Sequence, residues 1–169
     1  MANPTYVLIN SYTVTSGGTS SVTFSSIPAT YTDLVVKASI RTDSASNLTG
    51  LITLNGSSSS FTYRQIEGNG ASATSYNGTT NATNTENGTG TTASTFSSFD
   101  FYFPNYAGST NKSFFVDSVT ENNATTAYLD MNAMLWSNTA AITSIAFAPG
   151  STANFVQYST FYLYGIKNS

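Results

Sequence analysis

The chain contains no cysteine and no histidine. The lack of cysteine excludes disulfide bonds and thiolate nucleophiles, and the lack of both excludes the usual Cys/His zinc sites. Without histidine, the chain cannot form a Ser-His-Asp triad, and it lacks the side chain that normally titrates near neutral pH. We therefore expect no catalytic residues, no metal site and no cofactor. We interpret the chain as a protein that is not an enzyme and acts by binding.

Charged residues are scarce: they make up 8% of the 169 residues, against roughly 25% in an average soluble domain. The five basic residues are spread along the chain, so no basic stripe predicts nucleic-acid binding. The surface must therefore consist largely of serine, threonine, asparagine, glycine and tyrosine. Copies of such a β-rich chain repel one another only weakly, and such proteins are often protected by assembly into a larger object.

Long hydrophobic runs are also missing. The first residues, 1–6, show no basic segment followed by an apolar one, and no run of about 20 apolar residues occurs anywhere. These patterns predict neither a signal peptide nor a membrane span. We expect a protein that is made in a cytoplasm and stays soluble until it is used.

The most informative stretch that is present is the β pattern of residues 155–166. Read with period two, one face carries Phe155, Gln157, Ser159, Phe161 and Leu163, and the other carries Val156, Tyr158, Thr160, Tyr162, Tyr164 and Ile166. The first face is typical of a core. The tyrosine-rich face fits either a surface that meets a partner or burial inside a sandwich. In both cases we expect this last strand to dock between other strands.

Other segments repeat the pattern. Residues 34–41 alternate between Leu34, Val36, Ala38 and Ile40 on one face and Lys37, Ser39 and Arg41 on the other. In residues 127–136, Leu129, Met131, Ala133 and Leu135 share one face, and Tyr128, Asp130, Asn132, Met134 and Trp136 share the other, although this composition would also suit a helix. Nine or ten short strands separated by Gly, Asn and Pro turns predict an all-β fold, an antiparallel β-sandwich that resembles a jelly roll.

Residues 67–95 interrupt this pattern. Of these 29 residues, 22 are serine, threonine, asparagine or glycine, and Tyr76 is the only large apolar one. We predict a single β-sandwich domain over residues 1–169, with a long polar insertion loop at about 67–95. The loop could be an arm that reaches a neighbour, an exposed tip, or a segment without a role. Because almost no apolar side chain would be lost, we expect deletion of residues 72–92 to leave the fold intact.

A few residues could carry a site. Asp117 and Glu121 would point the same way on a strand, but a glycosidase needs two acids facing a cleft, and alternating acids usually line a solvated face. Asp43 and the nearby Ser44, Ser46 and Asn47 offer oxygens for calcium, but without a dense Asp/Asn/Gly loop motif we interpret them as a polar turn. Trp136 is either a lid on the core or an exposed platform that stacks on a sugar ring.

Several segments resemble a family of small virion proteins of tailed bacteriophages. They are Phe24-Ser25-Ser26-Ile27-Pro28, Thr30-Tyr31-Thr32-Asp33-Leu34, Asn105-Tyr106, Ser109-Thr110-Asn111-Lys112, Ser118-Val119-Thr120-Glu121-Asn122-Asn123, and the closing run 156–166. The resemblance spans nearly the whole chain except residues 67–95, and it rests on strand and turn motifs. It implies a β-sandwich on the phage particle, a decoration or cement protein bound to the outer capsid surface, with trimers as the usual state and no catalytic residues.

The leading hypothesis is therefore a capsid cement protein, made in the host cytoplasm and located on the virion. Its expected partners are the major capsid protein and two further copies of the chain, with neither nucleic acid nor membrane. The candidate interface residues are Tyr158, Tyr162, Tyr164 and Tyr76. The alternative is a tail-fibre or adhesin module that binds host glycans through Trp136 and tyrosines.

Overall fold

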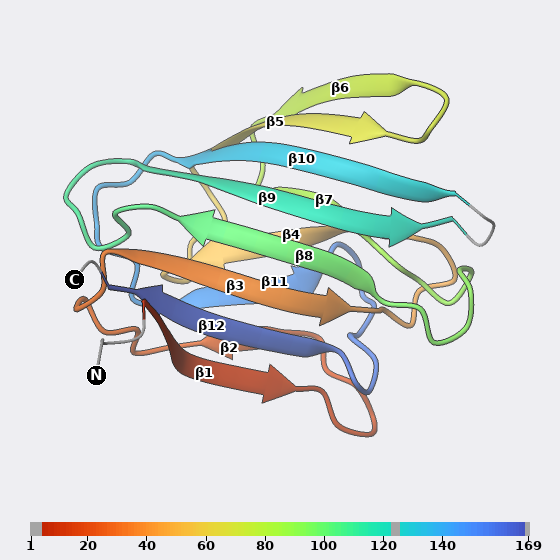
Figure 1. The fold of residues 1–169 in the computed structure, drawn as a ribbon, viewed down its shortest axis with the longest axis horizontal. Coiled ribbons are helices and arrows are strands. Elements are labelled where there is room, and N and C mark those ends of the chain that lie inside the picture. Colours follow the sequence, from red (N-terminus) through yellow and green to blue (C-terminus); the bar gives the residue numbers. More distant parts are fainter. Residues whose placement is uncertain (1–4, 123–125, 168–169) are drawn as a thin grey trace.

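The computed structural model describes residues 5–122 and 126–167, which form two antiparallel sheets (Figure 1). The large sheet has eight strands, in the spatial order β1 (Tyr6–Thr13), β12 (Thr160–Ile166), β3 (Asp33–Ile40), β8 (Ser97–Phe103), β9 (Lys112–Glu121), β10 (Ala127–Trp136), β5 (Phe61–Gly68) and β6 (Ala73–Gly78). The small sheet has four strands, in the order β2 (Val22–Phe24), β11 (Ile145–Pro149), β4 (Leu48–Leu54) and β7 (Ala82–Glu86).

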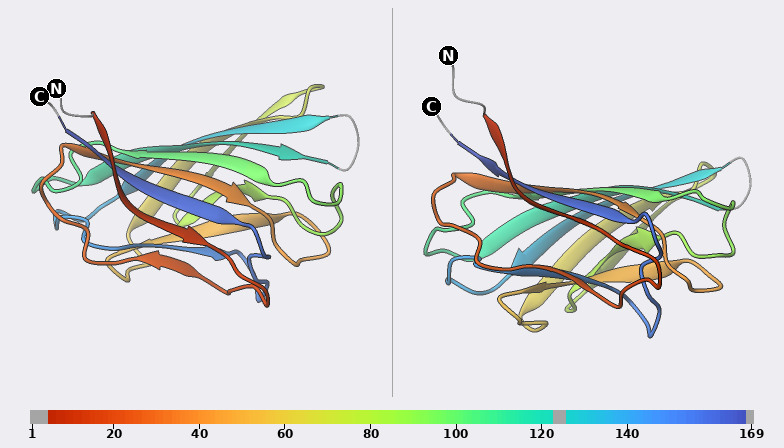
Figure 2. Two further views of the ribbon diagram at one scale, coloured as in Figure 1. Left: turned by 60° about the horizontal axis from the view of Figure 1, so that its bottom comes forward. Right: turned by 90° about the horizontal axis from the view of Figure 1, so that it is seen from below.

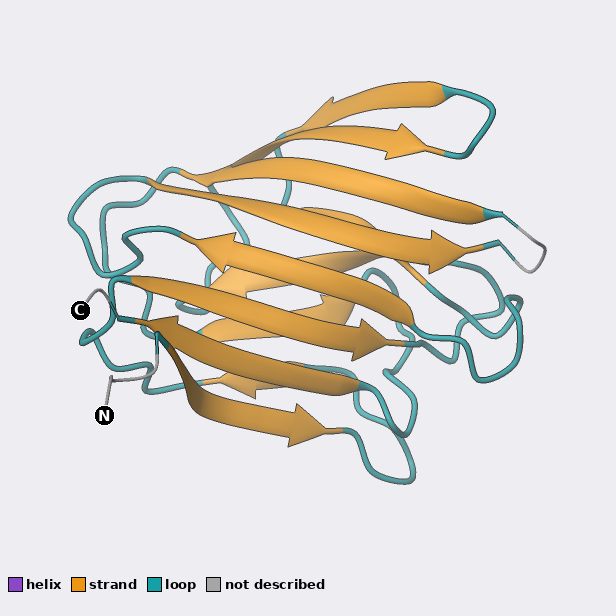
Figure 3. Cartoon of the chain, viewed as in Figure 1, coloured by secondary structure: helices purple, strands orange, loops and turns teal. Residues whose placement is uncertain are grey.

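The two sheets lie against each other as two layers (Figure 2). The part of the chain that the structure describes contains strands, turns and loops but no helix (Figure 3), and so no helix that could span a membrane. This arrangement confirms the prediction of an all-β, antiparallel sandwich. A jelly-roll connection of the strands stays a prediction.

The last strand, β12, lies between β1 and β3, as the sequence pattern predicted. Leu163 pairs with Val36 of β3, and Tyr164 pairs with Leu8 of β1. Its Phe161 and Leu163 are fully buried, which confirms the predicted core face. The strand is shorter than predicted, however, because it begins at Thr160 and Tyr158 has a positive φ of 73°.

The segment before β12 is therefore a separate element. Phe155 is buried and forms isolated bridges with Thr19 and Thr42. The period-two reading of residues 155–166 is wrong over its first five positions, because the left-handed backbone at Tyr158 interrupts the alternation.

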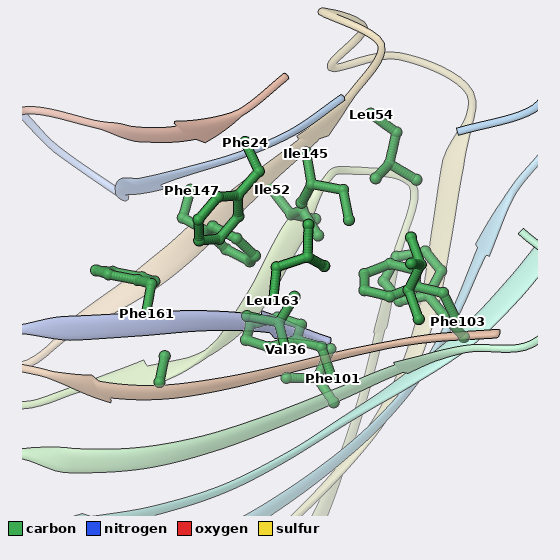
Figure 4. Packing of buried hydrophobic residues seen from close by; sticks show 14 of the residues in the cluster. Phe24, Val36, Ile52, Leu54, Phe101, Phe103, Ile145, Phe147, Phe161 and Leu163 are labelled. Atoms are coloured by element: carbon green, nitrogen blue, oxygen red, sulfur yellow. The ribbon is translucent and has the colours of Figure 1, made fainter. Parts of the chain in front are cut away.

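One region of the interior is aromatic. Phe101 from the large sheet meets Phe147 from the small sheet with ring centroids 5.0 Å apart, and Phe147 meets Phe161 at 5.5 Å (Figure 4). Phe103 also stacks on Phe114 at 4.8 Å. We call this the aromatic region. Its aromatic rings come from inward-facing positions of β8, β9, β11 and β12, as period-two strands require.

A second region of the interior is polar. In residues 127–136, the polar side of the strand faces the interior and the apolar side faces outward, which is the opposite of what the composition suggests. Asp130 and Asn132 of β10 point inward and are buried, whereas Leu129 and Met131 point outward and are 49% and 52% exposed. The inward residues face β7, whose Asn84 is fully buried. We call the inward side chains of Asn84, Glu86, Ser118, Asp130 and Asn132 the polar region.

Hydrogen bonds hold two members of the polar region, Asn84 and Asp130. Asn84 Nδ2 donates to the backbone oxygens of Val116 at 2.9 Å and of Asp130 at 3.1 Å. The Asp130 carboxylate accepts from Gln65 Nε2 at 2.8 Å and from the Thr85 backbone N–H at 3.2 Å. The bonds of Asn84 and Thr85 join β7 of the small sheet to the large sheet, whereas in the aromatic region the two sheets are joined by ring packing.

The prediction of a long polar loop at 67–95 is wrong. This segment contains the end of β5, the edge strand β6 and the small-sheet strand β7, and its Asn84, Glu86 and Asn87 are buried. Composition was misleading because polar side chains in the second half of the segment are buried rather than exposed. Asn84 and Asn87 have hydrogen-bond partners there, and Glu86 is buried beside them, whereas β6 is exposed as the polar composition predicted.

The end of this segment is held by Arg41, whose side chain is buried rather than on the solvated side of its strand. Its Nη1 donates to Thr91 Oγ1 at 3.0 Å, to Thr92 O at 2.9 Å and to Thr95 O at 2.7 Å. Residues 91–95 are thus fastened to the end of β3.

Candidate functional site: the outer face of the large sheet

The inner face of the large sheet covers the core, and its outer face carries most of the exposed large apolar side chains of the described residues. Pairing registers place these side chains in two areas, one over β1 and β12 and the other over β9, β10 and β5. Because apolar patches of some hundreds of Å² are uncommon on monomeric proteins and often functional, this face is the candidate site.

The first area, which we call the tyrosine area, consists of Tyr6, Leu8, Tyr162 and Tyr164. Tyr6 and Leu8 are 55% and 52% exposed, and the rings of Tyr6 and Tyr164 meet edge to face at 6.3 Å. A register shift between Leu8 and Asn10 turns the second half of β1, so that Tyr12 lies on the opposite side of the strand and pairs with Phe161.

The candidate tyrosines are only partly brought together. Tyr162 and Tyr164 share the outer face of β12, so the alternative that this face is buried inside the sandwich is wrong, and a contact with a partner stays a prediction. Tyr158 is 68% exposed but lies in the turn before β12, where its N–H donates to Val14 O at 3.0 Å. Tyr76 lies on β6, at the opposite edge of the sheet, and pairs with Gln65 on the inner side.

The second area, which we call the apolar patch, was missed by sequence reasoning. It consists of side chains that are 41% to 56% exposed, namely Ile66, Phe115, Val119, Leu129 and Met131. A shallow groove of about 610 Å³ crosses it, and Arg64, Ser75, Asp117 and Ala133 also line this groove. The alternation Leu129, Met131, Ala133 was visible in the sequence, but only the polar partner strand β7 shows that this face points outward.

A short row of charged side chains separates the two areas. Lys37 of β3 forms an ion pair with Asp100 of β8, and Asp100 pairs across the strands with Asp117 of β9. Partial burial and the nearby Asp100 carboxylate raise the pKa of Asp117 above its usual value. Beside this row, the ring of Tyr102 stacks on Phe115 at 5.5 Å.

Trp136 is not a surface platform. Its side chain is 1% exposed and stacks on Phe61 of the neighbouring strand, with ring centroids 6.1 Å apart. The interpretation as part of the core is confirmed, and the glycan-stacking role for Trp136 is wrong because a sugar could not reach the ring.

Two of the acidic candidates, Glu121 and Asp43, have structural partners. Glu121 accepts hydrogen bonds from the backbone N–H of Thr92 at 2.5 Å and from Thr92 Oγ1 at 3.1 Å. The Asp43 carboxylate accepts from Asn154 N at 2.8 Å and Asn154 Nδ2 at 3.0 Å, and these bonds lower its pKa. The Asp43 carboxylate thus holds its own turn against the segment that contains Asn154. Within residues 5–122 and 126–167, no three acidic side chains gather as a metal site would require.

Comparisons with known proteins found no matching family model, no matching curated protein and no matching solved structure. The resemblance to virion proteins of tailed phages therefore stays a prediction.

Proposed function

We propose that this chain is a non-enzymatic structural protein of a tailed-phage virion, a cement protein that binds the outer capsid surface and stabilises contacts between capsomers. The observation that carries the proposal is the exposed tyrosine area on the outer face of the large sheet. The resemblance of the strand and turn motifs supplies the phage setting, and the major capsid protein is the proposed partner.

A cement protein needs a surface that keeps its shape before it binds, because ordering a flexible surface would cost part of the binding free energy. The outer face has this property, since the same strands bury Phe101, Phe103 and Leu163 on their inner side. Contacts that form only in the assembled particle then stabilise the particle by mass action.

Such a protein also contacts its own copies when it is arranged around a threefold position. Tyr76 lies on the edge strand β6, and Tyr162 and Tyr164 lie on β12, next to β1 at the opposite edge of the large sheet. A contact in which the β6 edge of one copy meets the β1–β12 edge of the next would use all three tyrosines. Contacts of this head-to-tail kind close into rings, and a ring of three is the proposed state.

Quantifying the chain against the major capsid protein in purified virions tests the proposal. A cement protein should be present in hundreds of copies per particle, and particles that lack it should lose their DNA at a lower temperature. A faint band that fractionates with tails would instead support the adhesin alternative. Absence of the chain from purified particles would overturn both.

A substitution sharpens this test. Tyr162→Ser removes an outer-face ring that is 37% exposed and should leave the melting temperature of the isolated protein nearly unchanged while it weakens binding to capsids. The matched control is Tyr12→Ser, which removes a similarly exposed ring on the other side of the β1 edge. Equal loss of binding in both variants would contradict a specific role of the outer face.

A further inference from the structure

The apolar patch has an ordered layout that can be read from the strand registers. One row across the sheet holds Val119 and Leu129, and the next holds Asp117, Met131 and Ile66. The third row holds Phe115, Ala133 and Arg64. The patch is therefore an apolar surface with one negative and one positive side chain at diagonally opposite places.

Neither charge is matched by an opposite charge within the described residues. Among the described residues, the Arg64 side chain bonds only to the backbone of its neighbour, since Nη1 donates to Tyr63 O at 2.7 Å. Asp117 faces the Asp100–Lys37 ion pair, in which the lysine is already bound to Asp100. A partially buried carboxylate that lacks a counter-charge is better stabilised by an arriving cation than by water alone.

We propose that the apolar patch binds the same patch of a second copy of this chain through a twofold contact. A twofold axis that lies in the contact plane and crosses β10 between Met131 and Ala133 places Asp117 of each copy opposite Arg64 of the other. Phe115, Met131 and Ile66 then lie close to the axis and pack against their own equivalents. Self-complementarity of this kind is what an isologous contact requires.

The size of the face is sufficient. Strands lie about 4.8 Å apart and rise about 3.3 Å per residue, so four strands of about nine residues cover roughly 600 Å². Specific interfaces bury about 600 to 1,000 Å² on each partner. The face of β9, β10, β5 and β6 thus reaches the lower end of that range, and its apolar centre flanked by charges is typical of such contacts.

This contact is a property of the chain alone and does not depend on the virion proposal. It also uses residues other than those of the proposed threefold contact, so the two would coexist. The purified protein should therefore contain an even number of copies, a dimer if the threefold contact forms only on the capsid and a hexamer if it forms in solution.

Charge reversal tests the pairing. Either single variant, Asp117→Arg or Arg64→Asp, places like charges opposite each other at two places in the contact. The affinity of the contact should fall at least roughly tenfold, and the mass measured by sedimentation should fall to half. The double variant Asp117→Arg/Arg64→Asp should restore the full mass. Thr23→Arg, at an exposed position on the outer face of the small sheet, is the control and should leave the mass unchanged.

Several results would overturn the proposal. They are an odd number of copies at about 100 µM, single variants that keep the full mass, or a folded double variant that stays at half mass. If Asp117→Arg fails to fold, Met131→Lys serves in its place, because Met131 is 52% exposed and should tolerate a charge while losing the contact.

Discussion

The aromatic and polar regions of the interior join the same two sheets by different means. In the aromatic region, Phe101, Phe147 and Phe161 need only shape and apolar surface, and their rings lie within 5.5 Å of a neighbour across the sheets. In the polar region, Asn84 is equally buried, but it is held by two directed hydrogen bonds. A hydrogen bond depends on the position of its two atoms, whereas ring packing depends on overall shape, so the bonded members of the polar region should depend more on individual atoms.

The largest expected effect comes from deleting residues 72–92. The sequence pattern predicts that this deletion is harmless, but the structure reverses that expectation. The deletion removes β6 and β7, strips β4 of a neighbour and takes Thr91 away from the buried Arg41. We expect loss comparable with a whole domain's stability of about 5–15 kcal/mol, seen as the absence of a cooperative melting transition.

A shorter deletion is the control for that experiment. Replacing residues 69–72, the turn between β5 and β6, with Asn-Gly should preserve the cooperative transition, since this turn is exposed or half-buried and lies outside both interior regions. A long deletion that melts like the native protein would show that the polar region contributes little to stability.

Phe101→Ala breaks the aromatic region and should rank second. Phe101 is 1% exposed and contacts Phe99, Phe103 and Phe147, so the truncation leaves a cavity between the sheets. Changes of this kind cost about 3–5 kcal/mol. Denaturant unfolding measures the cost, and Phe101→Leu, which keeps most of the volume, should recover more than half of it.

A matched pair of substitutions separates the role of hydrogen bonds from that of polarity. Asn84→Leu removes both bonds to the backbone oxygens of Val116 and Asp130 and should cost roughly 1–3 kcal/mol for each group left unpaired. Asn132 is equally buried, but its amide has no hydrogen-bond partner among the described residues. Asn132→Leu should therefore lower the free energy of unfolding clearly less than Asn84→Leu does. Equal losses would mean that side-chain shape, and not hydrogen bonding, determines the contribution of these residues to stability.

The smallest expected change is in pH dependence. Burial raises the pKa of Glu86 well above its usual value, so the folded state holds a proton that the unfolded chain releases at about pH 4.3. Stability from this group is complete below that pH and decreases as the pH rises toward the folded-state pKa. Glu86→Gln should unfold with a flatter pH profile and gain stability relative to the native chain at neutral pH. A profile of unchanged slope would assign the pH dependence to other groups.

The aromatic and polar regions also differ in how well they could be predicted from the sequence. The alternation of Leu34, Val36, Ala38 and Ile40, and that of Phe99, Phe101 and Phe103, identified strands and core faces correctly, because apolar burial leaves a period-two pattern. Residues 82–87 left no such pattern, because their buried side chains are threonine, asparagine and glutamate. Composition alone assigns such a segment to solvent.

The candidate site shows the same limit. Tyr162 and Tyr164 alternate along β12 with Phe161 and Leu163, which are typical core residues. Their outward direction could therefore be predicted from the sequence. The apolar patch could not, since Leu129 and Met131 look like core residues until Asp130 and Asn132 are seen to face Asn84. The side of a strand that faces inward is decided by its partner across the sandwich, and that partner is remote in sequence.

The position of β12 between β1 and β3 also governs how the chain can be made. Tyr6 pairs with Ile166, so the first strand has no neighbour in the sheet until β12 has left the ribosome. Until then the edge of β3 stays open to any extended segment nearby. Contacts between strands so distant in sequence form slowly, and these edges are exposed to aggregation until β12 has been made. Helper chaperones or low expression temperatures should therefore matter more for this protein's yield than its stability once folded.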